Sequence, residues 1–172
     1  MLITGANSGI GLEFARQYAA AGWTVIATHR HASTPDSLAA LMKQSKNVRA
    51  ERMDVTSVAE IRALSDKLKD MPIDVLINNA AVYADHGDWS TQKFGNLDYA
   101  LGETILKTNV LGPLFVSEAF VKQIGASEQK KIVSITSTHA SLTTADRRVE
   151  RCLIIEPARR VSTGRCSWCP TS

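Results

Sequence analysis

Hydrophobic and polar positions follow two periods along the chain, one typical of buried strands and the other of amphipathic helices. Short apolar runs predict strands at residues 2–3, 23–28, 48–53, 73–77 and 131–137. The run at 73–77 is apolar at nearly every position and lies between Pro72 and two asparagines. This pattern is typical of a strand that is buried on both faces.

Helical patterns fill the intervals between the first three predicted strands. The first helix should turn four apolar residues to one face: Ile10, Phe14, Tyr18 and Ala21. Gly22 is suited to end this helix, because glycine adopts the left-handed backbone that often follows a helix. The second helix should begin near Pro35 and continue to about Gln44.

Two further helical patterns precede the last two predicted strands. Ser57 and Glu60 have the spacing of a capping box, and an apolar stripe follows it at Val58, Ile61, Leu64 and Leu68. A polar loop at 80–97 leads into a helical pattern at 99–124, which Pro113 is expected to interrupt. Five strands alternating with helices predict an α/β fold, a doubly wound parallel sheet with helices on both faces.

Composition agrees with a globular domain and locates a boundary in the chain. The 172 residues are 44% hydrophobic and 22% charged, which argues against a disordered, collagen-like or coiled-coil protein. No apolar stretch approaches the roughly 20 residues that cross a bilayer, so we expect a cytoplasmic protein without a membrane partner. The net charge of +3 arises in residues 147–172, which carry +4 and hold all three cysteines. We therefore expect a domain at 1–146 and a different tail at 147–172.

A glycine-rich turn between the first strand and the first helix is the strongest candidate for chemistry. Thr4 to Gly11 read TGANSGIG, and this context lets main-chain N–H groups and a helix N-terminus receive a pyrophosphate. An ordinary strand–helix loop is the alternative. The candidate cofactor-binding residues here are Gly5, Asn7, Ser8, Gly9, Ile10 and Gly11.

Polar residues follow three other predicted strands or lie within the fourth helical pattern. They are Asp54 with Val55, Asn78-Asn79-Ala80-Ala81, Asn109 and Ser137. Taken singly, each has a structural explanation: a loop carboxylate or helix cap, a turn, a polar group within a helix bundle, and a strand-end hydroxyl. Taken together, the order and spacing of these residues indicate a functional site.

In this order and spacing, residues 1–146 resemble the short-chain dehydrogenase/reductase family, and the opening residues are similar to its C-factor-like branch. The resemblance implies a Rossmann-like sheet with strand order 3-2-1-4-5, here truncated to about five strands. It also implies a homo-oligomeric parent that transfers hydride between a nicotinamide and a small-molecule carbonyl or alcohol.

The resemblance assigns roles to the polar residues. The Asp54 carboxylate would contact the adenine amino group, and Val55, Asn78, Asn79 and Ala80 would contribute to the cofactor site. Asn109 would hold a proton-relay water, and Ser137 would contact the substrate carbonyl.

Arg30 bears on the choice of cofactor. It follows the second strand, where a carboxylate would bind a ribose 2′-hydroxyl and an arginine would accept a 2′-phosphate. Its neighbours are Thr28, His29 and His31, so no carboxylate stands there and NADP(H) is favoured over NAD(H). A solvated surface arginine is the alternative, and Ser8 stands where many NADP enzymes of the family have a basic residue.

Other residue patterns suggest no further partner. The four histidines lack metal-ligand spacing and are expected on the surface or in loops, so no metal site is predicted. Cys166 and Cys169 have no second pair with which to form a zinc site. No nucleic-acid-binding motif accompanies the arginines of the tail.

The family's reaction needs a tyrosine, as general acid, and a lysine four residues later, yet no Tyr or Lys follows Ser137 in this chain. Read in a shifted frame, the codons between Leu153 and Thr163 allow the family's Y-x-x-S-K-A pattern, which suggests a frameshifted tail. A deliberately different C-terminus is the alternative. The chain is then an inactive truncated reductase, a non-catalytic nucleotide-binding or signalling protein, or a pseudogene product.

Overall fold

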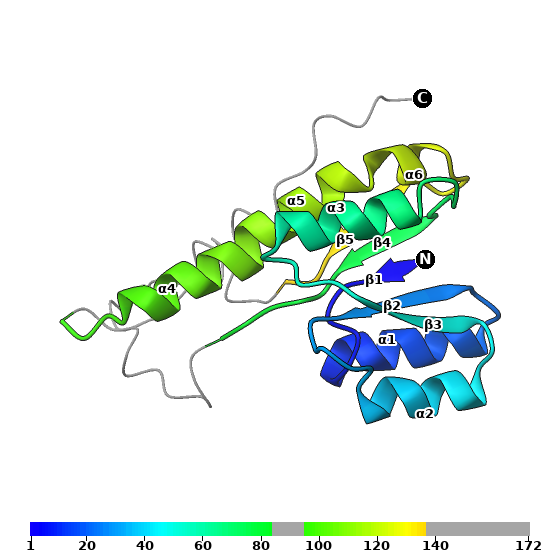
Figure 1. The fold of residues 1–172 in the computed structure, drawn as a ribbon, viewed down its shortest axis with the longest axis horizontal. Helices are drawn as coiled ribbons and strands as arrows, with labels where there is room; N and C mark the ends of the chain where they lie inside the picture. Colours follow the sequence, from blue (N-terminus) through cyan, green and yellow to red (C-terminus); the bar gives the residue numbers. More distant parts are fainter. Residues whose placement is uncertain (84–94, 137–172) are drawn as a thin grey trace.

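Five parallel strands form one sheet in the computed structural model, which describes residues 1–83 and 95–136. The strands are β1 (Leu2–Ile3), β2 (Val25–His29), β3 (Val48–Arg52), β4 (Val75–Asn78) and β5 (Lys131–Ser134). Their order in the sheet is β3-β2-β1-β4-β5, and every neighbouring pair is parallel (Figure 1). The predicted α/β class and strand order are therefore confirmed.

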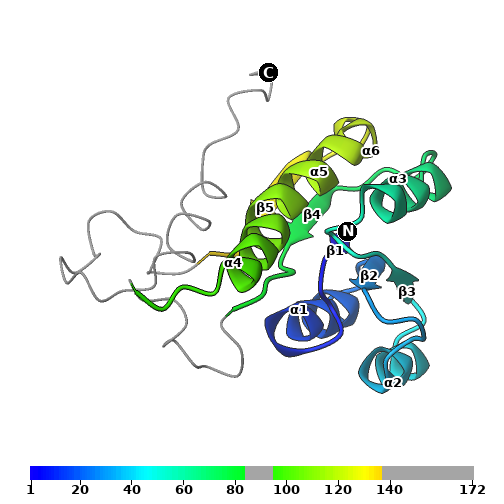
Figure 2. The same ribbon diagram turned by 60° about the vertical axis from the view of Figure 1, so that its left-hand side comes forward.

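Helices cover both faces of the sheet. On one face lie α1 (Gly9–Ala20) and α2 (Asp36–Gln44), and on the other lie α3 (Val58–Lys67), α5 (Gly112–Ala119) and α6 (Val121–Gly125) (Figures 1 and 2). A further helix, α4 (Tyr99–Leu106), continues through a π-helical segment (Lys107–Leu111) into α5 and projects past the sheet. No helix in residues 1–83 and 95–136 is long and apolar enough to cross a membrane.

Successive side chains along the central strands point to opposite faces of the sheet, and this divides the core into two layers. Leu2 stands beside Ile26 and Leu76 in the sheet, and all three are buried in the layer under α3, α5 and α6. Their chain neighbours Ile3, Ala27 and Ile77 are buried in the opposite layer, under α1 and α2. Since both faces are covered, the strands are apolar at successive positions, as the sequence pattern predicted.

The buried face of α1 differs from the predicted stripe. Gly11, Ala15 and Ala19 form it, whereas Ile10 is 61% exposed. Small residues let the helix axis approach the sheet and the preceding turn closely, and larger side chains such as Phe14 pack at the flank. The prediction was wrong here because it ranked positions by hydrophobicity and took no account of the space between helix and sheet.

The predicted interruption at Pro113 takes the form of the π-helical segment that precedes it. Proline has no N–H to donate to the carbonyl four residues earlier, which belongs to Asn109. In this segment the N–H of Gly112 bonds instead to the carbonyl of Lys107, five residues back. A second interruption falls at Phe120, between α5 and α6.

The strand predicted at 131–137 is shorter than expected, because β5 ends at Ser134. Ile132 and Val133 are each 38% exposed, and within the described part of the chain β5 pairs only with β4. It is thus an edge strand with apolar side chains on both faces. Ser137 and the tail at 147–172 lie outside the described residues.

Phe120 is expected to be a major contributor to stability. Its side chain is fully buried in the layer that also contains Leu76, so Phe120→Ala should lower the free energy of unfolding by about 3–5 kcal/mol. Urea denaturation followed by circular dichroism measures this change. Leu114 on α5 is 53% exposed, and Leu114→Ala should change the same quantity by no more than about 0.5 kcal/mol. Equal losses for the two variants would contradict the assignment of the core.

Candidate functional site

A cleft of about 410 Å³ lies at the carboxyl ends of the strands. It is bordered by segments that follow β1, β2, β3 and β4. From β1 the chain adds strands toward one edge of the sheet, and from β4 it adds strands toward the other edge, so the cleft spans the point where the strand order reverses. In open parallel sheets this position is the usual ligand site. Its lining residues are Gly5, Asn7, Ser8, Ile10, His29, Arg30, His31, Met53, Asp54, Val55, Asn79, Ala80, Ala81, Val82, Tyr83 and Thr108.

Glycines allow the turn after β1 to pass close to the turn after β4. Gly5 has φ +63°, and a Cβ there would lie 2.8 Å from the Cα of Ala80. A Cβ on Gly11 would overlap Nδ2 of Asn79 and would lie 2.5 Å from the carbonyl oxygen of Gly5. Gly9, by contrast, has φ +52° and open space around it, so its requirement is conformational.

Hydrogen bonds between the two turns complete this contact. The Thr4 hydroxyl accepts from the N–H groups of Asn79 and Ala80 at 2.9 and 3.0 Å. In return, Asn79 Nδ2 donates to the carbonyls of Thr4 and Gly5 at 3.0 and 3.1 Å. Asn79 therefore shapes the glycine-rich turn as well as lining the cleft.

The N-terminus of α1 opens at the cleft. Ser8 precedes the helix, but its side chain accepts no hydrogen bond from the first helical N–H groups. These groups carry the positive end of the helix dipole, and their geometry suits a phosphate oxygen. Together with the two glycines at positive φ, the turn fits a pyrophosphate group.

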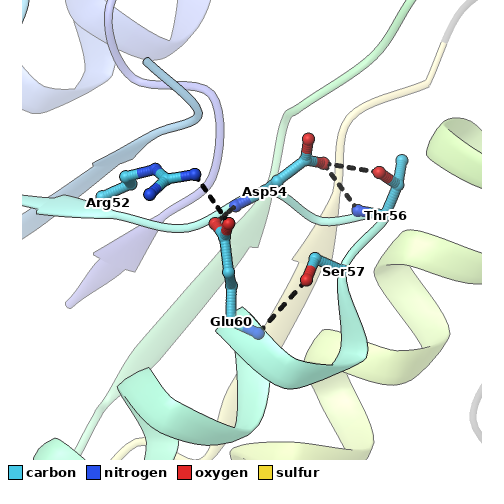
Figure 3. Close-up of polar contacts among 5 residues, drawn as sticks. All are labelled: Arg52, Asp54, Thr56, Ser57 and Glu60. Carbon is cyan, nitrogen blue, oxygen red and sulfur yellow. Dashed lines mark hydrogen bonds and ion pairs between the residues drawn. The ribbon is translucent and has the colours of Figure 1, made fainter. Parts of the chain in front are cut away.

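Asp54 presents one carboxylate oxygen for a ligand. Its Oδ1 accepts from the N–H and the hydroxyl of Thr56, both at 2.8 Å, and the other oxygen points away from Thr56 (Figure 3). The adjacent Val55 is 6% exposed and packs against Gly112, where a Cβ would lie 3.1 Å from Val55 Cγ2. The segment after β3 is thus held from two sides, and Asp54 lines the cleft.

The end of β2 brings Arg30 to the cleft between two histidines. Arg30 is exposed, whereas His29 is only 4% exposed, and its Nδ1 has no partner among the described residues. Burial, with a smaller contribution from His31, lowers the pKa of His29 below its ordinary value. The expectation that the histidines lie on the surface or in loops is therefore wrong for His29, which the strand carries into the protein. His86 and His139 lie outside the described residues.

The two remaining predicted asparagines act on neighbouring segments. Asn78 is buried and donates to the Ser117 hydroxyl on α5 at 3.1 Å, so its side chain does not line the cleft. Asn109, in the π-helical segment, accepts from the Val82 N–H at 2.9 Å and donates to the Val82 carbonyl at 2.8 Å. It thereby fixes the segment after β4. Its predicted role in holding a water stays a prediction.

Most of the predicted cofactor residues line one cleft, and the exceptions adjoin it. Gly9 and Gly11 lie in the turn region after β1, Asn78 ends β4, and Ser137 lies outside the described residues. Sequence reasoning missed seven lining residues: His29, His31, Met53, Ala81, Val82, Tyr83 and Thr108. Several of them directly adjoin a predicted residue, so the available signal was their position at the carboxyl end of a strand.

Gly11 should be far less tolerant of substitution than Gly9. In Gly11→Ala the new methyl group would meet a main-chain carbonyl that cannot rotate away, so we expect a loss of about 1–3 kcal/mol in the free energy of unfolding. Gly9→Asn is the control, because asparagine tolerates a positive φ and nothing lies within 4 Å. Urea denaturation compares the two. A Gly11→Ala protein as stable as Gly9→Asn would disprove the close contact between the turns.

Sequence comparisons relate the chain to known enzymes. The sequence model of the short chain dehydrogenase family matches residues 1–148. (+)-Neomenthol dehydrogenase of Arabidopsis thaliana is 28% identical over 160 residues, which cover 82% of this chain and 54% of that protein. Short-chain dehydrogenase/reductase 1 of Saponaria officinalis is 31% identical over 156 residues, which cover 79% of this chain and 52% of that protein.

Structural comparison gives the same relationship. The crystal structure of NADPH-bound carbonyl reductase from chicken fatty liver matches with a TM-score of 0.76 and 26% identity, covering 94% of this chain and 65% of that one. The chain spans about half the length of the curated relatives it matches. Because the family match includes both turns of the cleft and all of the described residues, the chain belongs to the short-chain dehydrogenase/reductase family of oxidoreductases.

Proposed function

We propose that the cleft binds NADP(H), and that the parent protein transfers hydride between this cofactor and a carbonyl or alcohol group of a small molecule. One observation carries the proposal. The N-terminus of α1, which Ser8 leaves uncapped, opens at a cleft that Arg30 and Asp54 also line, at the carboxyl edge of the sheet. These three features suit the pyrophosphate, a 2′-phosphate and the adenine amino group of one dinucleotide.

The preference for NADP(H) over NAD(H) rests on charge. A dianionic 2′-phosphate needs a cation, and Arg30 supplies one at the end of β2, where no carboxylate stands. An NAD site would instead place a carboxylate there to bind the 2′-hydroxyl. The presence of NADPH in the chicken carbonyl reductase structure supports the same choice.

Asn109 and Ser137 are the proposed catalytic residues of this chain. Asn109 would hold a proton-relay water, while its side chain keeps Val82 in place beside the cleft. Ser137 would bind the carbonyl oxygen of the substrate. The cofactor, when bound, supplies the hydride.

A non-catalytic nucleotide-binding protein is the second candidate. It is favoured by the sequence after Ser137, which contains no Tyr and no Lys through residue 172. Without a phenol whose pKa is brought down toward neutrality, the chain has no counterpart of the family's proton donor. Binding without turnover is the behaviour that separates this candidate from an active reductase.

Charge reversal at Arg30 should change cofactor preference. Arg30→Asp should weaken NADPH binding by about 10–100-fold, the loss expected for a hydrogen bond to a charged group, and should leave NADH binding within about twofold. Fluorescence titration or calorimetry gives both dissociation constants. Arg62→Asp makes the same charge change at an exposed site on α3 that does not line the cleft, and it should alter neither constant by more than about twofold. Equal losses for NADPH and NADH in Arg30→Asp would disprove the assignment.

Turnover by the 172-residue chain should be close to background. Loss of a general acid typically lowers a rate by about 10²–10⁴-fold, and loss of the lysine also removes the group that tunes its pKa. Oxidation of NADPH by a generic diketone or aldehyde, followed at the cofactor's absorbance, measures this rate. Turnover at ordinary enzyme rates would show that proton transfer needs no tyrosine–lysine pair.

A further inference from the structure

Glu60 makes an unexpected connection between α3 and the cleft. The spacing of Ser57 and Glu60 predicted a capping box. One of its two hydrogen bonds is present, because the Ser57 hydroxyl accepts from the Glu60 N–H at 3.3 Å. In a complete box the glutamate would accept from the N–H of Ser57. Here the Ser57 N–H bonds to the Asp54 carbonyl at 3.0 Å. The Glu60 carboxylate is thereby left for other donors.

Those donors are Arg52 and the main chain of Asp54. Glu60 Oε1 accepts from Arg52 Nη2 at 2.8 Å, and Oε2 accepts from the Asp54 N–H at 2.9 Å (Figure 3). Asp54 is therefore held at its N–H by Glu60 and at its carbonyl by Ser57. Thr56 fixes one oxygen of its carboxylate. Within residues 1–83 and 95–136, every polar group of Asp54 has a partner except the oxygen that points away from Thr56.

We propose that Glu60 is a positioning residue for recognition of the adenine base: it fixes Asp54 so that the free carboxylate oxygen meets the 6-amino group. This inference rests on the proposed nucleotide-binding function and adds a residue outside the cleft lining. A carboxylate acceptor selects an amino group over a carbonyl, because it offers no proton to a second acceptor. Such selection depends on geometry, since hydrogen bonds weaken steeply with misalignment.

The chemistry of its partners requires a carboxylate at position 60. Arg52 Nη2 and the Asp54 N–H are both donors, and only a carboxylate offers an acceptor oxygen to each. In Glu60→Gln the amide nitrogen would face one of these donors, and that contact would be lost. Arg52 and Glu60 are 56% and 29% exposed, so their ion pair adds little to stability. The effect of the variant should therefore appear mainly in base recognition.

Base discrimination is measured with two reduced nucleotides that differ at one group. NADPH carries the 6-amino group, and its hypoxanthine analogue carries a carbonyl there. The wild-type chain should bind NADPH about 10–100-fold more tightly than the analogue, the range expected for one hydrogen bond to a charged group. Asp54→Ala should bring this ratio close to one.

Glu60→Gln should lower the ratio at least about threefold while leaving affinity for the analogue within about twofold of wild type. Glu60→Asp keeps the charge but shortens the reach, and should lower the ratio as well. The double variant Asp54→Ala/Glu60→Gln should show the same ratio as Asp54→Ala alone, because both changes act on one contact. Glu13→Gln is the matched control: Glu13 on α1 is also ion-paired, with Arg16, and its loss should leave the ratio unchanged.

The outcomes separate the positioning role from the proposed function. If Glu60→Gln weakens both nucleotides equally, Glu60 has only a structural role and the inference is wrong. If Asp54→Ala abolishes discrimination but both Glu60 variants retain it, the nucleotide site stands and the inference is again wrong. If the wild-type chain binds neither nucleotide, the proposed function fails and the inference fails with it.

Discussion

The close approach of the turns after β1 and β4 is the constraint on which the rest of the site depends. Gly5 lies so near Ala80 that no side chain fits between them, and Thr4 and Asn79 bridge the two turns with four hydrogen bonds. This contact sets the direction in which α1 leaves the sheet, and hence where its open N-terminus lies. It also brings the segment after β4 to the place where Asn109 can hold Val82.

The fold was largely predictable because the central strands are buried on both faces. Runs such as 73–77 are apolar at successive positions, and few structures other than a covered parallel sheet accommodate them. The buried face of α1 was not predictable in the same way. Gly11, Ala15 and Ala19 face the core because a close approach needs small residues, and hydrophobicity alone ranks them below Ile10, which is exposed.

Site residues were predictable where they belong to a local motif at the end of a strand. They were less predictable where their environment depends on packing against distant parts of the chain. The glycine-rich turn, Arg30 and Asp54 each follow a strand, so their place at the carboxyl edge comes with the fold. His29 also ends a strand, but its burial depends on the elements packed around it. Glu60 has the spacing of a helix cap, and only the structure shows that its carboxylate bonds to Arg52 and Asp54 instead.

Nucleotide binding and proton transfer place different demands on the chain, and this difference explains how one can be present without the other. The proposed pyrophosphate site consists of main-chain groups and glycines that lie within residues 1–83. Proton transfer requires particular side chains at particular points, and the tyrosine and lysine of the family are not found after Ser137. Since the residues proposed for the two functions lie on successive parts of the chain, a change in the later part would leave the residues that line the cleft intact. The hydrogen bonds that hold Asp54 lie entirely within residues 52–60, so the proposed recognition of the base would not depend directly on the residues after β5.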